Sequence, residues 1–205
     1  MITKSENQFS QFLSQLYHEY FNKLAGTLLA LVIALASNQW ANSVVELSLQ
    51  VLFRRQYPSL YKAIDQYQPE KGGMTLAHLA EPYLPPPLHR HFDLLGLDVT
   101  PDPRPFASKL ADRQYVHQPH PVKSNKPINI GHQFSELVAL PERKCPASPH
   151  WVIPLSDRRV PSEEDKEMVG ACQVRLLLEK IERFQKGFCV LVADCSYSKP
   201  AFLMR

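Results

Sequence analysis

The distribution of proline limits the folds open to this 205-residue chain more than any other feature of its sequence. Fifteen of the 18 prolines lie between Pro82 and Pro161, and long helices cannot run through such spacing. Before Pro82 the pattern is helical, because apolar and aromatic residues recur at three- and four-residue steps on one face: Phe9, Phe12, Leu13, Leu16, Tyr17 and Tyr20. We therefore expect helices up to residue 80 and another architecture beyond it.

The second half of the chain has the period of β-strands. Short apolar or alternating runs predict strands over 92–100, 127–141, 150–161 and 188–194. A helix is expected between the last two strands, starting after Ser162 as N-cap and stopping at Gly187. The fold class is therefore α/β, or α+β overall, with a helical region at 1–80, a stiff proline-rich linker at 81–91 and a mixed sheet at 92–205.

Composition narrows the class of protein without naming a function. An apolar share of 44% and a charged share of 21% are typical of a folded globular chain, and the formal charge of +3 permits nucleic acid as a partner. Four cysteines without metal-site spacing indicate reduced thiols. The apolar run at 24–36 has 13 residues, short of the roughly 20 that a membrane span needs. We expect a cytoplasmic protein that does not insert into a membrane.

Two aspartates each follow an apolar run and precede a loop. Asp98 stands in "GLDVTP" and Asp194 in "VADCSY". If the two strands are neighbours, the carboxylates converge, and paired carboxylates are usually retained around a cation such as Mg²⁺ or Mn²⁺, which serves phosphodiester chemistry. An aspartate at a strand end is also a common turn residue, because its side chain accepts hydrogen bonds from the following amides. The residues alone leave both interpretations open.

Several long segments closely resemble bacterial insertion-sequence transposases of the DDE superfamily, whose catalytic domain is RNase H-like. The resemblance covers residues 28–205 and is carried by "DVTPDPRPFASKLADRQYVHQPHPVKSNKPINIGHQFSELVALPE", "WVIPLSDRRVPSEEDKEMVGACQVRLLLEKI", "VLVADCSYSKPAFL" and "SVVELSLQVLFRRQYPSLYKAI". In such enzymes one catalytic acid ends the first strand, a second ends the fourth strand, and a third lies on a helix much further on. The resemblance thus implies Asp98 and Asp194 as the first two catalytic and metal-binding acids, with Mg²⁺ or Mn²⁺ as cofactor.

The third acid of that family has no counterpart in this sequence. The resemblance therefore implies the front portion of a transposase, with an incomplete RNase H-like sheet at 92–205 and little or no catalysis by this chain alone. The implied partners are the DNA of the element ends and either a second copy of the chain or the full-length transposase.

Two basic sets are candidates for contact with DNA. The first surrounds a turn that opens a helix, as in a helix-turn-helix: Arg54, Arg55, Tyr57, Ser59, Tyr61 and Lys62. The second follows Asp98 and includes Arg104, Lys109, Arg113, Lys123 and Lys126, which would hold the phosphate backbone beside the metal. Solvated surface charge is the alternative for both sets, and the resemblance, rather than the spacing, favours DNA.

Two other functions stay open. One is a truncated DNA-binding or inhibitory interaction module that recognises element ends or pairs with the full enzyme. The other is a complete small hydrolase, which would need further ligands near Asp98, such as Asp102 or Glu136.

Overall fold

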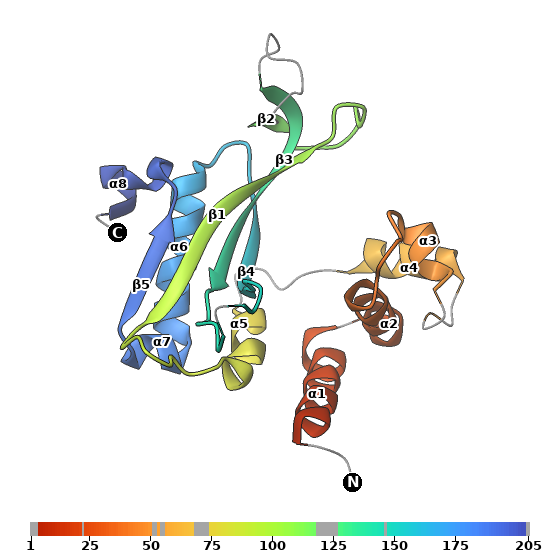
Figure 1. Cartoon of the computed structure of the whole chain (residues 1–205). Helices are drawn as coiled ribbons and strands as arrows, with labels where there is room; N and C mark the ends of the chain where they lie inside the picture. The colour runs from red at the N-terminus through yellow and green to blue at the C-terminus, as the bar shows by residue number, and fades with distance from the viewer. Residues whose placement is uncertain are drawn as a thin grey trace. The chain divides into compact units, whose positions relative to one another are not determined.

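The computed structural model of the chain describes residues 4–21, 23–50, 53, 56–67, 74–117, 127–145 and 147–203 (Figure 1). The chain divides into two compact units, Met1–Thr75 and Leu76–Arg205. The division into a DNA-binding region, a linker and a catalytic domain stays a prediction.

The N-terminal unit is helical, as its periodicity predicts. Its elements are α1 (Lys4–Gln15), the π-helical turn η1 (Leu16–Tyr20), α2 (Ala25–Ala36), α3 (Val44–Ser48) and α4 (Tyr57–Gln66). Ser43 caps α3 by accepting a hydrogen bond from the amide of Glu46, and Pro58 stands in the first turn of α4, where its missing amide costs nothing. A small core joins α2, α3 and α4 through Ala34, Leu47, Phe53 and Leu60.

The C-terminal unit is built on a five-stranded mixed sheet (Figure 1). Its strands are β1 (Asp93–Pro103), β2 (Gln114–His117), β3 (Ile128–Ala139), β4 (Ile153–Val160) and β5 (Cys189–Ala193). β3 pairs antiparallel with β1, β2 and β4, whereas β5 pairs parallel with β1 and forms an edge of the sheet. The predicted α/β class with a helical N-terminal region and a mixed sheet is confirmed.

One face of this sheet is covered by a helix that connects β4 to β5. This helix, α6 (Lys166–Lys180), is followed at once by α7 (Glu182–Lys186). α6 lies close to the sheet at Gly170, where a Cβ atom would come within 2.8 Å of Leu97 and 2.9 Å of Tyr197. Buried apolar side chains fill the layer between them: Leu95, Leu97, Leu137, Leu155 and Leu177. Because strands alternate their faces, the residues between these leucines lie on the opposite face.

β1 is longer than the sequence predicts. The proline-rich stretch after Thr100 was expected to close the strand, yet pairing with β3 continues to Pro103 opposite Gly131. The pairing of β1 with β5 stops at Leu97, so the rest of β1 pairs with β3 alone among the described residues, and prolines are tolerated in such an edge strand. Gly131 permits the close approach, since a Cβ atom there would lie 2.1 Å from the Asp102 carbonyl oxygen.

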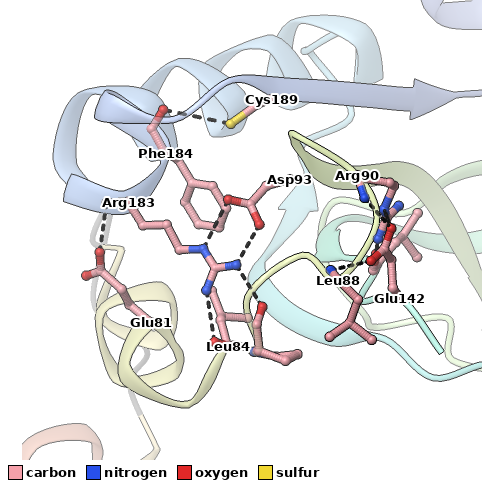
Figure 2. A network of polar contacts seen from close by, with 11 residues as sticks. Glu81, Leu84, Leu88, Arg90, Asp93, Glu142, Arg183, Phe184 and Cys189 are labelled. Carbon is pink, nitrogen blue, oxygen red and sulfur yellow. Dashed lines mark hydrogen bonds and ion pairs between the residues drawn. The ribbon is translucent and has the colours of Figure 1, made fainter. Parts of the chain in front are cut away.

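The segment 81–91, for which we expect a linker, is held against the C-terminal unit. It follows α5 (Thr75–Ala80) and begins with the short 3₁₀ helix η2 (Glu81–Tyr83). Arg183 of α7 donates hydrogen bonds to the carbonyl oxygens of Leu84 and Pro85, and Glu142 accepts from the amides of the next turn (Figure 2). This stretch is therefore anchored at both ends by side chains that are distant in sequence.

The helices also bear on membrane insertion. Among the described residues, none of the helices combines the length and the apolar character that crossing a bilayer requires.

Candidate active site

The register of the parallel pair places Asp98 and Asp194 side by side. Paired positions of β1 and β5 run from Asp93 opposite Cys189 to Leu97 opposite Ala193. The next residues on the two strands are Asp98 and Asp194. Because neighbouring strands lie about 4.8 Å apart, the two carboxylates start from adjacent backbone positions at one end of the pair.

Asp98 lies within β1 and not at its end, and its side chain is exposed. Its Oδ1 accepts a hydrogen bond from the Val99 amide at 2.7 Å. Across the sheet it pairs with Glu136 on β3, which in turn pairs with Asp157 on β4. Burial raises the pKa of Asp157, and the nearby charge of Glu136 raises it further. A row of carboxylates therefore crosses the sheet on the face away from α6.

Asp194 caps the 3₁₀ helix η3 (Cys195–Ser198). Its Oδ1 accepts hydrogen bonds from both the amide and the hydroxyl of Ser196. The hydroxyl bond is the main reason that the pKa of Asp194 lies below its usual value, and the charge of Lys166 contributes as well. The aspartate thus has the hydrogen bonds of a turn residue and stays ionised, which is also what a metal ligand requires.

Tyr197 of η3 lies against α6 at Gly170 and is almost fully buried. Burial, together with the charges of Asp194, Asp98 and Glu167, raises the pKa of Tyr197 to about 12. Its hydroxyl neighbours that of Ser135, and both oxygens are buried without a well-formed hydrogen bond to any described residue. A neutral phenol therefore lies near enough to the two aspartates for their charges to act on it, on the side of the sheet that α6 covers.

Glu167 is a third acid close to this site, on the first turn of α6. It is 5% exposed, and its carboxylate lies 2.7 Å from Nζ of Lys199. Burial pushes the pKa of Glu167 upwards, but the hydrogen bond and charge of Lys199 bring it below the usual value. Glu167 is thus ionised and paired with Lys199, which directly precedes the short helix α8 (Pro200–Leu203).

The donor set matches a hard cation only in part. Carboxylate oxygens such as those of Asp98 and Asp194 suit Mg²⁺ or Mn²⁺. Within the described ranges, however, no three histidine, cysteine, aspartate or glutamate side chains are grouped so that they could hold a metal ion. The described part of the chain therefore offers such an ion two carboxylates that follow the last β1–β5 pair, with Glu136 opposite Asp98 on β3.

The predicted DNA-contacting residues of the N-terminal unit lie on or just before α4. Arg54 and Arg55 lie outside the described residues. Tyr57, Tyr61 and Lys62 are exposed, Ser59 is half-buried, and the opposite side of α4 buries Leu60 and Ala63 in the core. The rings of Tyr57 and Tyr61 meet edge to face at 6.4 Å. The helix thus presents an aromatic and basic side to solvent.

The second basic set is partly engaged within its own loop. Arg104 pairs with Asp102 at 3.0 Å, and Arg113 donates to the carbonyl oxygens of Arg104 and Ser108. Lys109 is exposed, whereas Lys123 and Lys126 lie outside the described residues. These two arginines therefore help to shape the loop between β1 and β2.

Of the two further ligands considered for a compact hydrolase, Asp102 lies far from Asp98 along β1, whereas Glu136 lies next to Asp98. Asp102 lies four residues beyond Asp98 on β1, which is about 13 Å at the usual rise, and it is paired with Arg104. Glu136 lies directly opposite Asp98. The period-two alternation of "FSELVAL" predicts which face of the sheet Glu136 lies on. Its position opposite Asp98 is known only from the pairing of β1 with β3. Tyr197 and Glu167 carry no signal in the sequence that marks them as neighbours of the aspartates.

Comparison with known proteins gives one result. No curated protein and no solved structure matches the chain significantly. The family described as DDE superfamily endonuclease matches residues 11–205, which is nearly the whole sequence and includes both aspartates. This chain therefore belongs to the DDE superfamily endonuclease family, a group of transposase-like nucleases.

Proposed function

We propose that this chain acts on the ends of a mobile DNA element, with Asp98 and Asp194 as ligands of Mg²⁺ or Mn²⁺. The observation that carries the proposal is the register of β1 and β5, which starts both carboxylates from adjacent positions. In enzymes of this kind the metal activates the attacking oxygen and stabilises the charge on the phosphate. The protein's own part is to hold the two carboxylates ionised, and the hydrogen bonds from Ser196 to Asp194 support this role.

We further propose that the 205-residue polypeptide, taken alone, binds DNA without cutting it. Two metal ions about 3.5–4 Å apart need more ligands than two carboxylates supply. Glu136 lies directly opposite Asp98, but no three acids among the described residues are grouped so that they could hold a metal ion. Glu167 is already paired with Lys199. The same deficit favours a second role, an inhibitory module that occupies element ends or pairs with a complete transposase.

DNA contact is proposed for α4 and for the loop after β1. Exposed Tyr57, Tyr61 and Lys62 support the first, together with Ser59 and the preceding Arg54 and Arg55. Arg104 and Arg113 are proposed to reach phosphates from the β1–β2 loop. A second copy is a proposed partner because β5 is an edge strand on which Val192 is 53% exposed, and the cytoplasm is the proposed location.

The test is Mn²⁺ binding by the purified 205-residue chain. Asp98→Asn and Asp194→Asn should each lower the affinity by about tenfold or more, which corresponds to about 1.4 kcal/mol. Asp102→Asn is the matched control, since it removes the same charge from the same strand and should leave Mn²⁺ affinity unchanged. Equal affinity in all three variants would refute the proposed site.

DNA cleavage is measured on the same samples. We expect none in Mg²⁺ or Mn²⁺. Cleavage that disappears in Asp98→Asn would overturn the proposal of inactivity and would favour a complete nuclease.

A further inference from the structure

An open groove of about 550 Å³ lies on the C-terminal unit, away from the two aspartates. Leu94 and Leu140 line it, and Trp151 and Val152 of the stretch before β4 line it as well. The Leu140 amide donates to the Leu94 carbonyl oxygen, so the β1–β3 pairing continues to this point. By strand alternation Leu94 is on the same face as Asp98, which is the face that α6 leaves uncovered.

The lining of the groove combines apolar and basic side chains. Arg90, Arg143 and Lys144 line it, against Glu142 as the one carboxylate among the lining residues that the structure describes. Arg143 and Lys144 are exposed, and Arg143 also donates a hydrogen bond to the Ser148 carbonyl oxygen at 3.4 Å. Glu142 does not offset them, because its carboxylate accepts hydrogen bonds from three backbone amides and pairs with Arg90 at 2.9 Å. The surplus positive charge makes this a site for an anion.

The wall of the groove is built in advance. Arg90 donates to the Leu140 carbonyl oxygen at 2.8 Å while it pairs with Glu142, and Glu142 holds the backbone of Leu88 and His89 (Figure 2). A wall fixed by this many polar contacts loses little conformational entropy when a ligand binds.

Trp151 distinguishes this groove from an ordinary basic patch. Trp151 lines the groove and is 47% exposed, so its ring is accessible to a ligand there. An aromatic ring beside lysine and arginine is the combination that holds single-stranded nucleic acid, since bases stack on the ring and phosphates meet the cations. Duplex bases are already stacked on one another and gain nothing from the indole.

We propose that this groove binds single-stranded DNA, with an unpaired base on Trp151 and the backbone on Arg143 and Lys144. The inference rests on the proposed function, which makes DNA the partner. Leu94 is four residues from Asp98, about 13 Å along β1, so one strand can reach both places. The groove would hold DNA that is unpaired beside the aspartates.

Tryptophan fluorescence tests the proposal directly, because the chain has two tryptophans, Trp40 and Trp151. In the variant Trp40→Phe, Trp151 is the sole tryptophan. A thymidine oligonucleotide of about twelve nucleotides, a length within known single-strand site sizes, should quench it in EDTA. Binding is measured by the anisotropy of the labelled oligonucleotide. Trp151→Ala should weaken it by roughly five- to 150-fold, the range measured for loss of one stacked base.

Charge variants test the phosphate contacts. Lys144→Ala should lower the slope of log affinity against log salt by about 0.7, the value for one contact with a single strand. Lys180→Ala is the matched control, because this exposed lysine lies at the end of α6 on the other side of the sheet, and its slope should equal that of the parent. Thermal melts of each variant verify folding, which exposed side chains should not disturb.

Each of the following results would overturn the inference: no binding of the oligonucleotide, binding without quenching of Trp151, equal binding of a blunt duplex, or quenching that grows with protein concentration in the absence of DNA. The last would identify a second copy of the chain as the occupant. Asp98→Asn should leave the quenching in EDTA unchanged, so failure of the groove and failure of the metal site are separate outcomes.

Discussion

Arg183 and Asp93 form a two-point ion pair, with Nε 3.0 Å from Oδ2 and Nη2 2.6 Å from Oδ1 (Figure 2). The same guanidinium donates to the carbonyl oxygens of Leu84 and Pro85, while the Arg183 amide donates to Glu81. One residue of α7 therefore fixes the start of β1 and the segment that precedes it.

Replacing Arg183 by methionine should lower the free energy of unfolding by about 2–4 kcal/mol. The change leaves Asp93 and two carbonyl oxygens without their donor, and removing one member of a largely buried pair costs about this much. Urea unfolding measures the loss, and limited proteolysis should show new cleavage within 84–91. Lys186→Met on the same helix, which breaks only an exposed ion pair, should change stability by less than about 0.5 kcal/mol. Equal losses in the two variants would contradict this assignment.

Gly131→Ala should destabilise the outer part of the β1–β3 pair by about 1–3 kcal/mol, the usual cost of overpacking. The new methyl group would lie 2.1 Å from the Asp102 carbonyl oxygen, a backbone atom that cannot move aside alone. The amide of Arg104, which donates to the Ile130 carbonyl oxygen, should exchange its hydrogen faster in this variant. Gly187→Ala, which replaces a glycine outside this strand pair, is the comparison for amide exchange at Arg104. Unchanged protection at Arg104 would show that the strands adjust without separating.

The contribution of Glu142 to stability should disappear in acid. Burial pushes its pKa upwards, but amide hydrogen bonds, first that of His89, and the charge of Arg90 hold it below 4.5. Because the folded pKa is lower than the unfolded one, this stability is present above pH 4.5 and is lost as the pH falls through the folded pKa. Thermal melts from pH 7 to pH 3 should show Glu142→Gln less stable than the parent at neutral pH, with the difference closing in acid. A constant difference would exclude the carboxylate charge as its cause.

The phenol of Tyr197 should ionise only at high pH. Its pKa of about 12, raised chiefly by burial, exceeds the usual value of 10, so the unfolded chain loses this proton first. Stability is therefore unaffected below pH 10 and falls as the pH rises above it. Ultraviolet titration of the phenolate should show a late component that is missing in Tyr197→Phe. Since the buried hydroxyl has no well-formed hydrogen bond among the described residues, Tyr197→Phe should not lower stability at neutral pH. A clear loss there would indicate a partner for the hydroxyl.

The strands and the main helix could be predicted because each has a local signal. Alternation in 127–141 gives β3 and its buried face, and the long apolar period before Gly187 gives α6. The helix expected over 162–187 is in fact interrupted at Ile181, whose extended backbone separates α6 from α7. No glycine or proline marks this break. Ile181 is fully buried, so packing against the sheet overrides the local preference.

The candidate site could be predicted only as two separate acids. The apolar runs before Asp98 and Asp194 are visible in the sequence, but the adjacency of the two aspartates depends on β5 pairing with β1 rather than with β4. Likewise, "PPPLHR" predicts a stiff extended segment, whereas its attachment is decided by Arg183 and Glu142, each more than fifty residues away. Contacts set by side chains so distant in sequence leave no periodic trace.

The parallel pairing of β1 with β5 also has a kinetic consequence. β1, β3 and β4 pair antiparallel and can form as the chain is made. β5 pairs with β1, so it must close a loop that contains β3, β4 and α6. Such long-range contacts form late in folding, because the loop-closure entropy is lost before the contact repays it. Asp98 gains Asp194 as a neighbour only at that step. A collapsed intermediate with three strands already paired would therefore lack the Asp98–Asp194 pair, and recovery of metal binding should lag behind recovery of the β-sheet signal during refolding.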